Sequence, residues 1–134
     1  MNNRSLEGEL KGWVAEWNNY RALMFESIDS MIKIGETKGK DGYVLYAANM
    51  LDLMGDVLCC FYLLKQAENA QNKWKGMITQ KVSQEELLAE NQEAQFYWNK
   101  LRTVEYYVWS VLPRALSNAK TIKNANLSPL NACL

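Results

Sequence analysis

The sequence has no histidine among its 134 residues. This absence removes the most common general acid and base and the most common metal ligand of proteins. The chain also lacks a Glu-x-x-His pair, a Cys-x-x-Cys pair, a phosphate-binding loop and a Gly-x-Gly-x-x-Gly fingerprint. We therefore expect no catalytic, cofactor-binding or metal-binding residue in this chain.

Neither basic nor acidic residues are in excess, and the chain has few cysteines. Fifteen basic residues balance fifteen acidic ones, which argues against a nucleic-acid partner. The three cysteines are the adjacent Cys59 and Cys60 together with Cys133, which is not the pattern of a disulfide framework. The first residues contain no apolar core of a signal peptide. We expect a cytoplasmic protein, and whether Met1 is a natural start stays open.

The longest apolar stretch, residues 43–67, is apolar on nearly every helical face. Asp52, Gly55 and Asp56 interrupt it before it reaches the roughly 20 residues that a bilayer requires. A helix that is apolar all round is typical of the centre of a fold. The stretch therefore predicts the inner helix of a soluble bundle and no membrane span.

Two prolines and seven glycines divide the chain into long segments. Apolar residues recur at steps of three and four over residues 6–31, which predicts a helix. The charged segment 35–42 contains three glycines and predicts a loop. Ser83 and Glu86 predict a capping box at a helix start, and Pro113 predicts a kink or a break.

Together these signals predict an all-α fold, an up-down helical bundle of three long helices in a single domain. The expected boundaries are about 5–34, 43–74, 84–112 and, after the kink or break at Pro113, 113–124 as a fourth helix.

Asp52 and Asp56 are four residues apart and so share one face of the predicted inner helix, about 6 Å apart. One interpretation makes one of them an acid with a raised pKa. The other has them face Arg21, Arg102 or Lys100 across the bundle or lie along an exposed face, with Asp56 able to pair with the third helix. We favour structural roles for Asp52, Asp56, Lys100 and Arg102.

Aromatic residues surround the whole circumference of the predicted third helix. One face of a bundle helix cannot bury them all, and exposed aromatic patches usually mark an interface. The candidate interface residues are Tyr97, Trp98, Tyr106, Tyr107 and Trp109.

Two motifs resemble the C-terminal extension of the acyl-CoA dehydrogenases, the acetyl-CoA dehydrogenase C-terminal-like domain, in the branch that includes 3-methylmercaptopropionyl-CoA dehydrogenase. The first motif lies in residues 50–67. Its matching residues are Leu51, Leu53, Gly55, Val57 and Ala67. At three positions this chain departs from the family pattern: Met50 replaces an aromatic residue, Cys60 a glycine and Phe61 a tryptophan.

The second motif lies in the predicted third helix and is the stronger of the two. It comprises Phe96, Tyr97, Lys100, Leu101, Tyr107, Leu112 and Pro113. The segment 122–130 resembles the closing segment of the family, with Asn124 and Ala125 where a glycine-centred turn is expected. The resemblance covers residues 5–134.

The resemblance implies an accessory helical domain of an FAD-dependent acyl-CoA dehydrogenase. In that family FAD, the acyl-CoA and the catalytic glutamate are held by preceding domains, so this chain is expected to bind no cofactor and to be inactive alone. Its expected partners are the upstream dehydrogenase domains and a second copy in a homodimer, and it would help to shape the substrate entrance. The alternatives are a free-standing protein interaction module and, with less support, a small-molecule carrier with its ligand near Asp52 and Tyr46.

Overall fold

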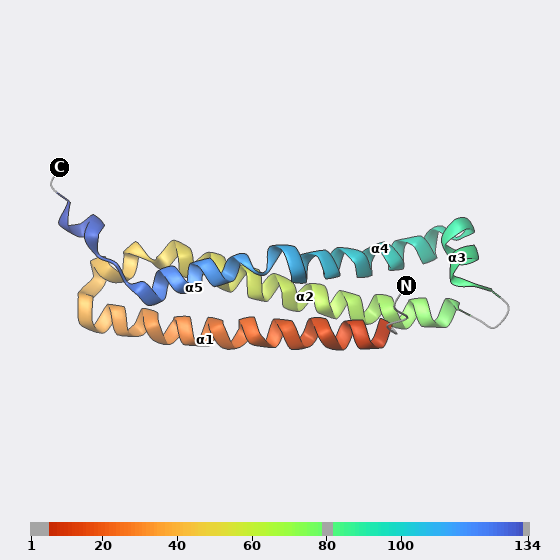
Figure 1. The fold of residues 1–134 in the computed structure, drawn as a ribbon, viewed down its shortest axis with the longest axis horizontal. Coiled ribbons are helices and arrows are strands. Elements are labelled where there is room, and N and C mark those ends of the chain that lie inside the picture. The colour runs from red at the N-terminus through yellow and green to blue at the C-terminus, as the bar shows by residue number, and fades with distance from the viewer. Residues whose placement is uncertain (1–5, 79–81, 133–134) are drawn as a thin grey trace.

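The structure, a computed structural model, describes residues 6–78 and 82–132. The long helices α1 (Leu6–Leu45) and α2 (Ala47–Met77) lie antiparallel, and a third arm runs beside them (Figure 1). This third arm consists of α4 (Gln92–Tyr106), the π-helical turn η1 (Tyr107–Val111) and α5 (Arg114–Asn124). The short helices α3 (Gln84–Glu90) and η2 (Ser128–Asn131) precede and follow it. The predicted all-α, up-down bundle is confirmed.

The chain reverses between the two antiparallel helices at two bends, one at Gly39 within the segment assigned to α1 and one at Tyr46 just before α2. We predicted a loop over residues 35–42, but the backbone is helical there except at Gly39, whose φ of 72° lies in the left-handed region. Glycine adopts this conformation at little cost. A Cβ on the buried Gly42 would come within 2.8 Å of the Cβ of Lys38, so this glycine lets the two segments approach closely. The predicted loop was wrong because bends at Gly39 and Tyr46 reverse the chain while the residues between them stay helical.

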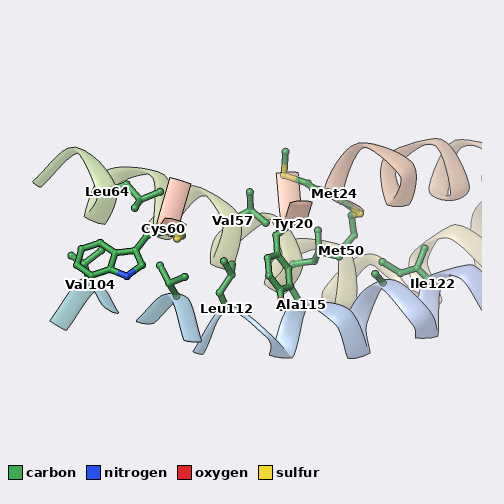
Figure 2. Packing of buried hydrophobic residues seen from close by; sticks show 14 of the residues in the cluster. Tyr20, Met24, Met50, Val57, Cys60, Leu64, Val104, Leu112, Ala115 and Ile122 are labelled. Atoms are coloured by element: carbon green, nitrogen blue, oxygen red, sulfur yellow. The ribbon is translucent and has the colours of Figure 1, made fainter. Parts of the chain in front are cut away.

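α2 is the central helix, since it packs against α1, α4 and α5. Its inward residues follow one another at steps of three and four, the spacing of a bundle helix. Figure 2 shows how they meet the other arms: Tyr20 and Met24 come from α1, Met50, Val57, Cys60 and Leu64 from α2, and Val104, Leu112, Ala115 and Ile122 from the third arm. The predicted inner helix therefore lies where the sequence indicated.

By length and composition alone, α2 is the one helix of the described residues that could cross a membrane. Its most apolar window has a mean hydropathy of 1.5, and 33% of that window is buried inside the bundle. The core helix of a soluble protein has the same composition. That the chain does not span a membrane stays a prediction.

The helix predicted from residue 84 onward is interrupted at Asn91. Its beginning is as predicted, because the Ser83 hydroxyl accepts from the Glu86 amide at 3.2 Å and the Glu86 carboxylate accepts from the Ser83 amide at 3.1 Å. Asn91 then ends α3 and begins α4, and its side chain accepts from the Ala94 amide at 3.0 Å. Asparagine favours such positions because its side chain competes for backbone hydrogen bonds. The uninterrupted helix 84–112 was therefore wrong.

The break at Pro113 is confirmed, and it is preceded by the wide turn η1. There the Leu112 amide donates to the Tyr107 carbonyl at 2.8 Å, five residues back. Proline lacks an amide and its ring crowds the preceding turn, so a wider turn accommodates it. α5 ends at Ala125, which has a φ of 45° where glycine is the usual residue.

Candidate functional site

An ion pair between a buried carboxylate and a mostly exposed guanidinium joins α2 to α5. The guanidinium of Arg114 binds both carboxylate oxygens of Asp56, with Nε 2.7 Å from Oδ2. The Asp56 side chain is 3% exposed, and the Arg114 side chain is 66% exposed. The hydrogen bonds and the negative charge of Asp56 raise the pKa of Arg114. Both carboxylate oxygens are thus occupied by one planar partner, the strongest geometry for such a pair.

We expected Asp56 to face Arg21, Arg102 or Lys100, and its partner is Arg114 instead. This residue immediately follows Pro113 and the wide turn η1, which changes the helical phase of everything after it. Asp52 is exposed on α2, although its charge contributes to the raised pKa of Arg114. The two carboxylates therefore do not share one buried site.

Tyr107 lies beside the pair, and its hydroxyl donates to the backbone carbonyl of Asp56 at 3.3 Å. Burial, followed by the charge of Asp56, raises the pKa of Tyr107 to about 12.

The two adjacent cysteines of α2 differ in exposure. Cys60 is buried, and burial raises the pKa of its thiol to about 12, whereas Cys59 is exposed. The adjacent cysteines therefore differ, because Cys60 lies in the core of the bundle and Cys59 faces solvent.

The two thiols should therefore differ in reactivity. Because the thiolate is the nucleophile, Cys60 should resist alkylation at pH 8, where its protonated form dominates, while Cys59 reacts quickly. Peptide mapping after a timed reaction with iodoacetamide, in a Cys133→Ser background, measures both rates. Equal rates for the two residues would contradict the burial of Cys60.

Arg102 lies at the centre of a second cluster, between the third arm and α1. Its guanidinium binds Glu9 at 2.7 Å and Glu105 at 2.8 Å. It also lies over the ring of Trp98 at 4.7 Å and faces Trp13 at 5.8 Å. This cation joins α1 to α4, which agrees with a structural role.

Lys100 makes a local contact instead. Its ammonium group lies 5.4 Å from the centre of the Phe96 ring on the same helix.

The five aromatic residues predicted as an interface do not form one surface. Trp98 packs on Trp74 with ring centres 5.2 Å apart, Tyr107 contacts α2, and the Tyr97 hydroxyl donates to Glu93. Tyr106 and Trp109 are 65% and 54% exposed. A role in an interface stays a prediction, and these last two are its best candidates.

Apolar side chains that were predicted to be covered face solvent on the outward side of α2 and of the residues just before it. We predicted that this helix is covered on nearly every side, yet Val44, Leu51, Leu58 and Tyr62 are 48 to 72% exposed. Only three arms are present in the described bundle, so the side of α2 opposite the core faces solvent. A second periodicity within residues 43–67 could have revealed it.

Shallow grooves rather than an enclosed cavity lie between the arms. One lies between α1 and α2, holds about 240 Å³ and includes Trp17 and Phe61 in its walls. Another, of about 360 Å³, lies between α1 and α5. Tyr46 is buried and its hydroxyl donates to the Asn126 carbonyl, whereas Asp52 is exposed, so the ligand site suggested near these two residues is not formed. Among residues 6–78 and 82–132, no cluster of cysteine and acidic side chains could hold a metal ion.

Comparison with known protein families gives one match. A family model described as "Acetyl-CoA dehydrogenase C-terminal like" matches residues 3–132 of this chain. Neither the comparison with curated proteins nor the one with solved structures found a match.

Proposed function

The chain belongs to the acetyl-CoA dehydrogenase C-terminal-like family, and on this premise we propose that it is the accessory helical domain of an FAD-dependent acyl-CoA dehydrogenase. In this proposal it takes no part in the chemical step. It packs on the domains that hold the flavin and the thioester, contributes to the dimer of the parent enzyme and shapes the entrance for the acyl-CoA. The family match over nearly the whole chain is the observation that carries the proposal.

The polar groups of the core support an accessory role. The buried polar residues of the described chain are Ser27, Asp56 and Gln71. The Ser27 hydroxyl donates to a carbonyl within α1 at 2.8 Å, and Asp56 is held by Arg114. Ser27 is thus satisfied within its own helix and Asp56 by its ion pair, whereas the buried Nε2 of Gln71 has no hydrogen-bond partner among the described residues. A domain of this kind acts on its partners through its surface.

Tyr106 and Trp109 are the residues through which we propose that the domain contacts the dehydrogenase body. They are more than half exposed and only three residues apart, at the start of η1. Large aromatic side chains are enriched in the centres of interfaces because they bury much apolar surface while losing little conformational freedom. The flavin and the base that removes the substrate α-proton would come from the preceding domains. We also propose the 3-methylmercaptopropionyl-CoA branch and a cytoplasmic location.

The first test is genetic. We expect the coding DNA before the codon for Met1, or a neighbouring gene, to encode a flavin-binding dehydrogenase domain. A start at Met1 with no such neighbour would favour a free-standing interaction module. Retention of stoichiometric flavin by the purified chain, together with oxidation of an acyl-CoA by an artificial electron acceptor, would contradict the accessory role.

The second test concerns the contact surface. The dehydrogenase domains found in this way are coexpressed with the chain, and their affinity is measured by calorimetry. Trp109→Asp should weaken the complex at least about tenfold, as expected for a central aromatic residue. The control Leu130→Asp changes a residue that is 47% exposed in η2, beyond the C-terminal end of the third arm, and it should leave the affinity unchanged. Equal affinities for the two variants would reject this contact surface.

A further inference from the structure

The buried apolar side chains of the bundle form two separate cores. The main core runs along the three arms and contains most of the buried residues. The second, here called the end core, consists of Trp74, Leu87 and Ala94 and lies where α2 finishes and α4 begins (Figure 1). Among the described residues, Leu6 is the only partly buried apolar side chain that packs against both cores. Little apolar contact therefore joins the end core to the rest of the bundle.

Two polar side chains, here called the polar layer, lie at the boundary between the cores. On α2, Gln71 is 5% exposed and precedes Trp74 of the end core by three residues. On α4, the guanidinium of Arg102 lies 5.8 Å from the ring centre of Trp13, a main-core residue. The same guanidinium lies 4.7 Å from the ring centre of Trp98, which packs against the end core. The two cores thus meet across polar groups.

Hydrogen-bond donors at this boundary have no acceptor among the described residues. They are Nε2 of Gln71, Nε1 of Trp74 and Nε of Arg102. A buried N–H group without an acceptor is unfavourable relative to one that is hydrated. Separation of the end core from the main core would let water reach all three donors. The boundary is therefore the place where the bundle parts most easily.

The segment that covers the end core depends on few contacts. α3 has seven residues, too few for a stable isolated helix, and its one buried side chain is that of Leu87. α3 packs chiefly on α4, and the side-chain amide of Gln95 donates to the Leu88 carbonyl at 2.6 Å. Asn91 joins the two helices by ending one and beginning the next. α3 and the start of α4 thus hold each other and can leave α2 together.

We propose that residues 82–98, here called the end cap, open away from α2 while the main core stays folded. The closed state is favoured by burial of Trp74 and by its ring contact with Trp98, with centres 5.2 Å apart. The open state is favoured by hydration of the three donors and by the freedom that a short helix regains. These opposing contributions make the open cap a minor population, reached more easily than global unfolding.

Opening changes which side chains the chain presents to its surroundings. Trp74 is 0% exposed in the closed state and becomes accessible when the end cap opens. A contact made only with the open state shifts the population toward it, so the end cap is a conformational switch at one end of the bundle. This inference concerns the chain itself and does not rest on the proposed accessory role.

Hydrogen exchange of the 134-residue chain, followed by mass spectrometry, tests the proposal. The hydrogen-bonded amides of residues 84–98 should be protected at least about 100-fold less than those of residues 50–67, because only the former exchange by local opening. Adding about 1 M urea should speed exchange in residues 50–67 but not in the end cap, since local opening exposes little new surface. Equal protection or an equal response to urea would overturn the proposal.

A core variant tests whether the cap opens independently. Leu53→Ala weakens the main core and should speed exchange of residues 50–67 about 100-fold. It should leave exchange of the end cap unchanged, because that opening does not unfold the main core. Acceleration of both regions by the same factor would show that the bundle opens as one unit and would reject the cap.

A variant of the polar layer distinguishes the cap from fraying of helix ends. Gln71→Met replaces an unpaired donor by an apolar side chain of similar length, so it should stabilise the closed state. All amides of the end cap should then exchange about tenfold more slowly and by the same factor. The control Gln66→Met makes the same change at an exposed position of α2 and should have no effect. Equal exchange in the two variants, or a slowing confined to single amides, would contradict the proposal.

Discussion

Leu53→Ala is expected to lower the free energy of unfolding by about 3 kcal/mol, the typical cost of a buried leucine-to-alanine change. Leu53 is 0% exposed and lies on the inward face of α2, where the helix meets the other arms. Removing its branched end leaves a cavity that three long helices cannot close by a local shift. Because a domain of this size is stable by only about 5–15 kcal/mol, the loss is a large share of the total.

Urea unfolding followed by tryptophan fluorescence and circular dichroism measures this effect. The control Leu116→Ala makes the same chemical change at a residue that is 53% exposed, so it should alter stability by no more than about 0.5 kcal/mol. Coincident transitions by the two probes would establish that the bundle unfolds as one unit. Similar losses for the two variants would contradict the position of Leu53 in the core.

The features predicted well from the sequence are those set by local chemistry or by a strong periodicity. The apolar steps of three and four over residues 6–31 identify a helix facing a core, whichever helices supply the rest of that core. Ser83 and Glu86 satisfy each other within one turn, and Pro113 cannot continue a regular helix in any context. These local structures therefore form in the same way whatever surrounds them in the fold.

The features that were missed depend on small changes of helical phase. Bends at Gly39 and Tyr46 replace the predicted eight-residue loop, and Asn91 ends one helix while it begins the next. Neither event disturbs the surrounding composition, so the pattern alone cannot distinguish them from a longer loop or a continuous helix. The partner of Asp56 was missed for a related reason, since η1 changes the direction in which Arg114 points.

The outer face of α2 shows what a single sequence can leave ambiguous. Apolar residues all round a helix predict that it is covered all round, and the prediction does not say whether the cover belongs to the same chain. The other two arms cover the inward face of α2, and Leu51, at 72% exposure, marks the side that they leave open. The same composition thus gives a correct prediction for the core and, for the opposite face, an indication of a partner.

Arg114→Met is expected to destabilise the bundle by about 1–2 kcal/mol, because the buried carboxylate of Asp56 loses its hydrogen-bond donors. The loss is smaller than for a fully buried ion pair because the Arg114 side chain is 66% exposed, so water can solvate the freed carboxylate. The Asp56 side chain is 3% exposed, and Arg114 supplies both hydrogen bonds to its oxygens. Methionine keeps most of the apolar stem of arginine, so the loss reports the missing charge rather than missing packing. The control Lys120→Met removes an exposed cation from the same helix and should change stability by no more than about 0.5 kcal/mol.

The double variant Asp56→Leu with Arg114→Met distinguishes two explanations of the stability lost in Arg114→Met. If the pair is mainly a device that keeps α2 and α5 in register, replacing both charges by apolar side chains should recover most of the stability that Arg114→Met removes, since no buried charge then remains. Urea unfolding of the two single variants and the double variant completes the cycle. Additive losses would instead show that the two side chains stabilise the bundle independently. Recovery would mean that Arg114 is needed chiefly because Asp56 is buried, which assigns the aspartate to the architecture of the bundle and not to acid catalysis.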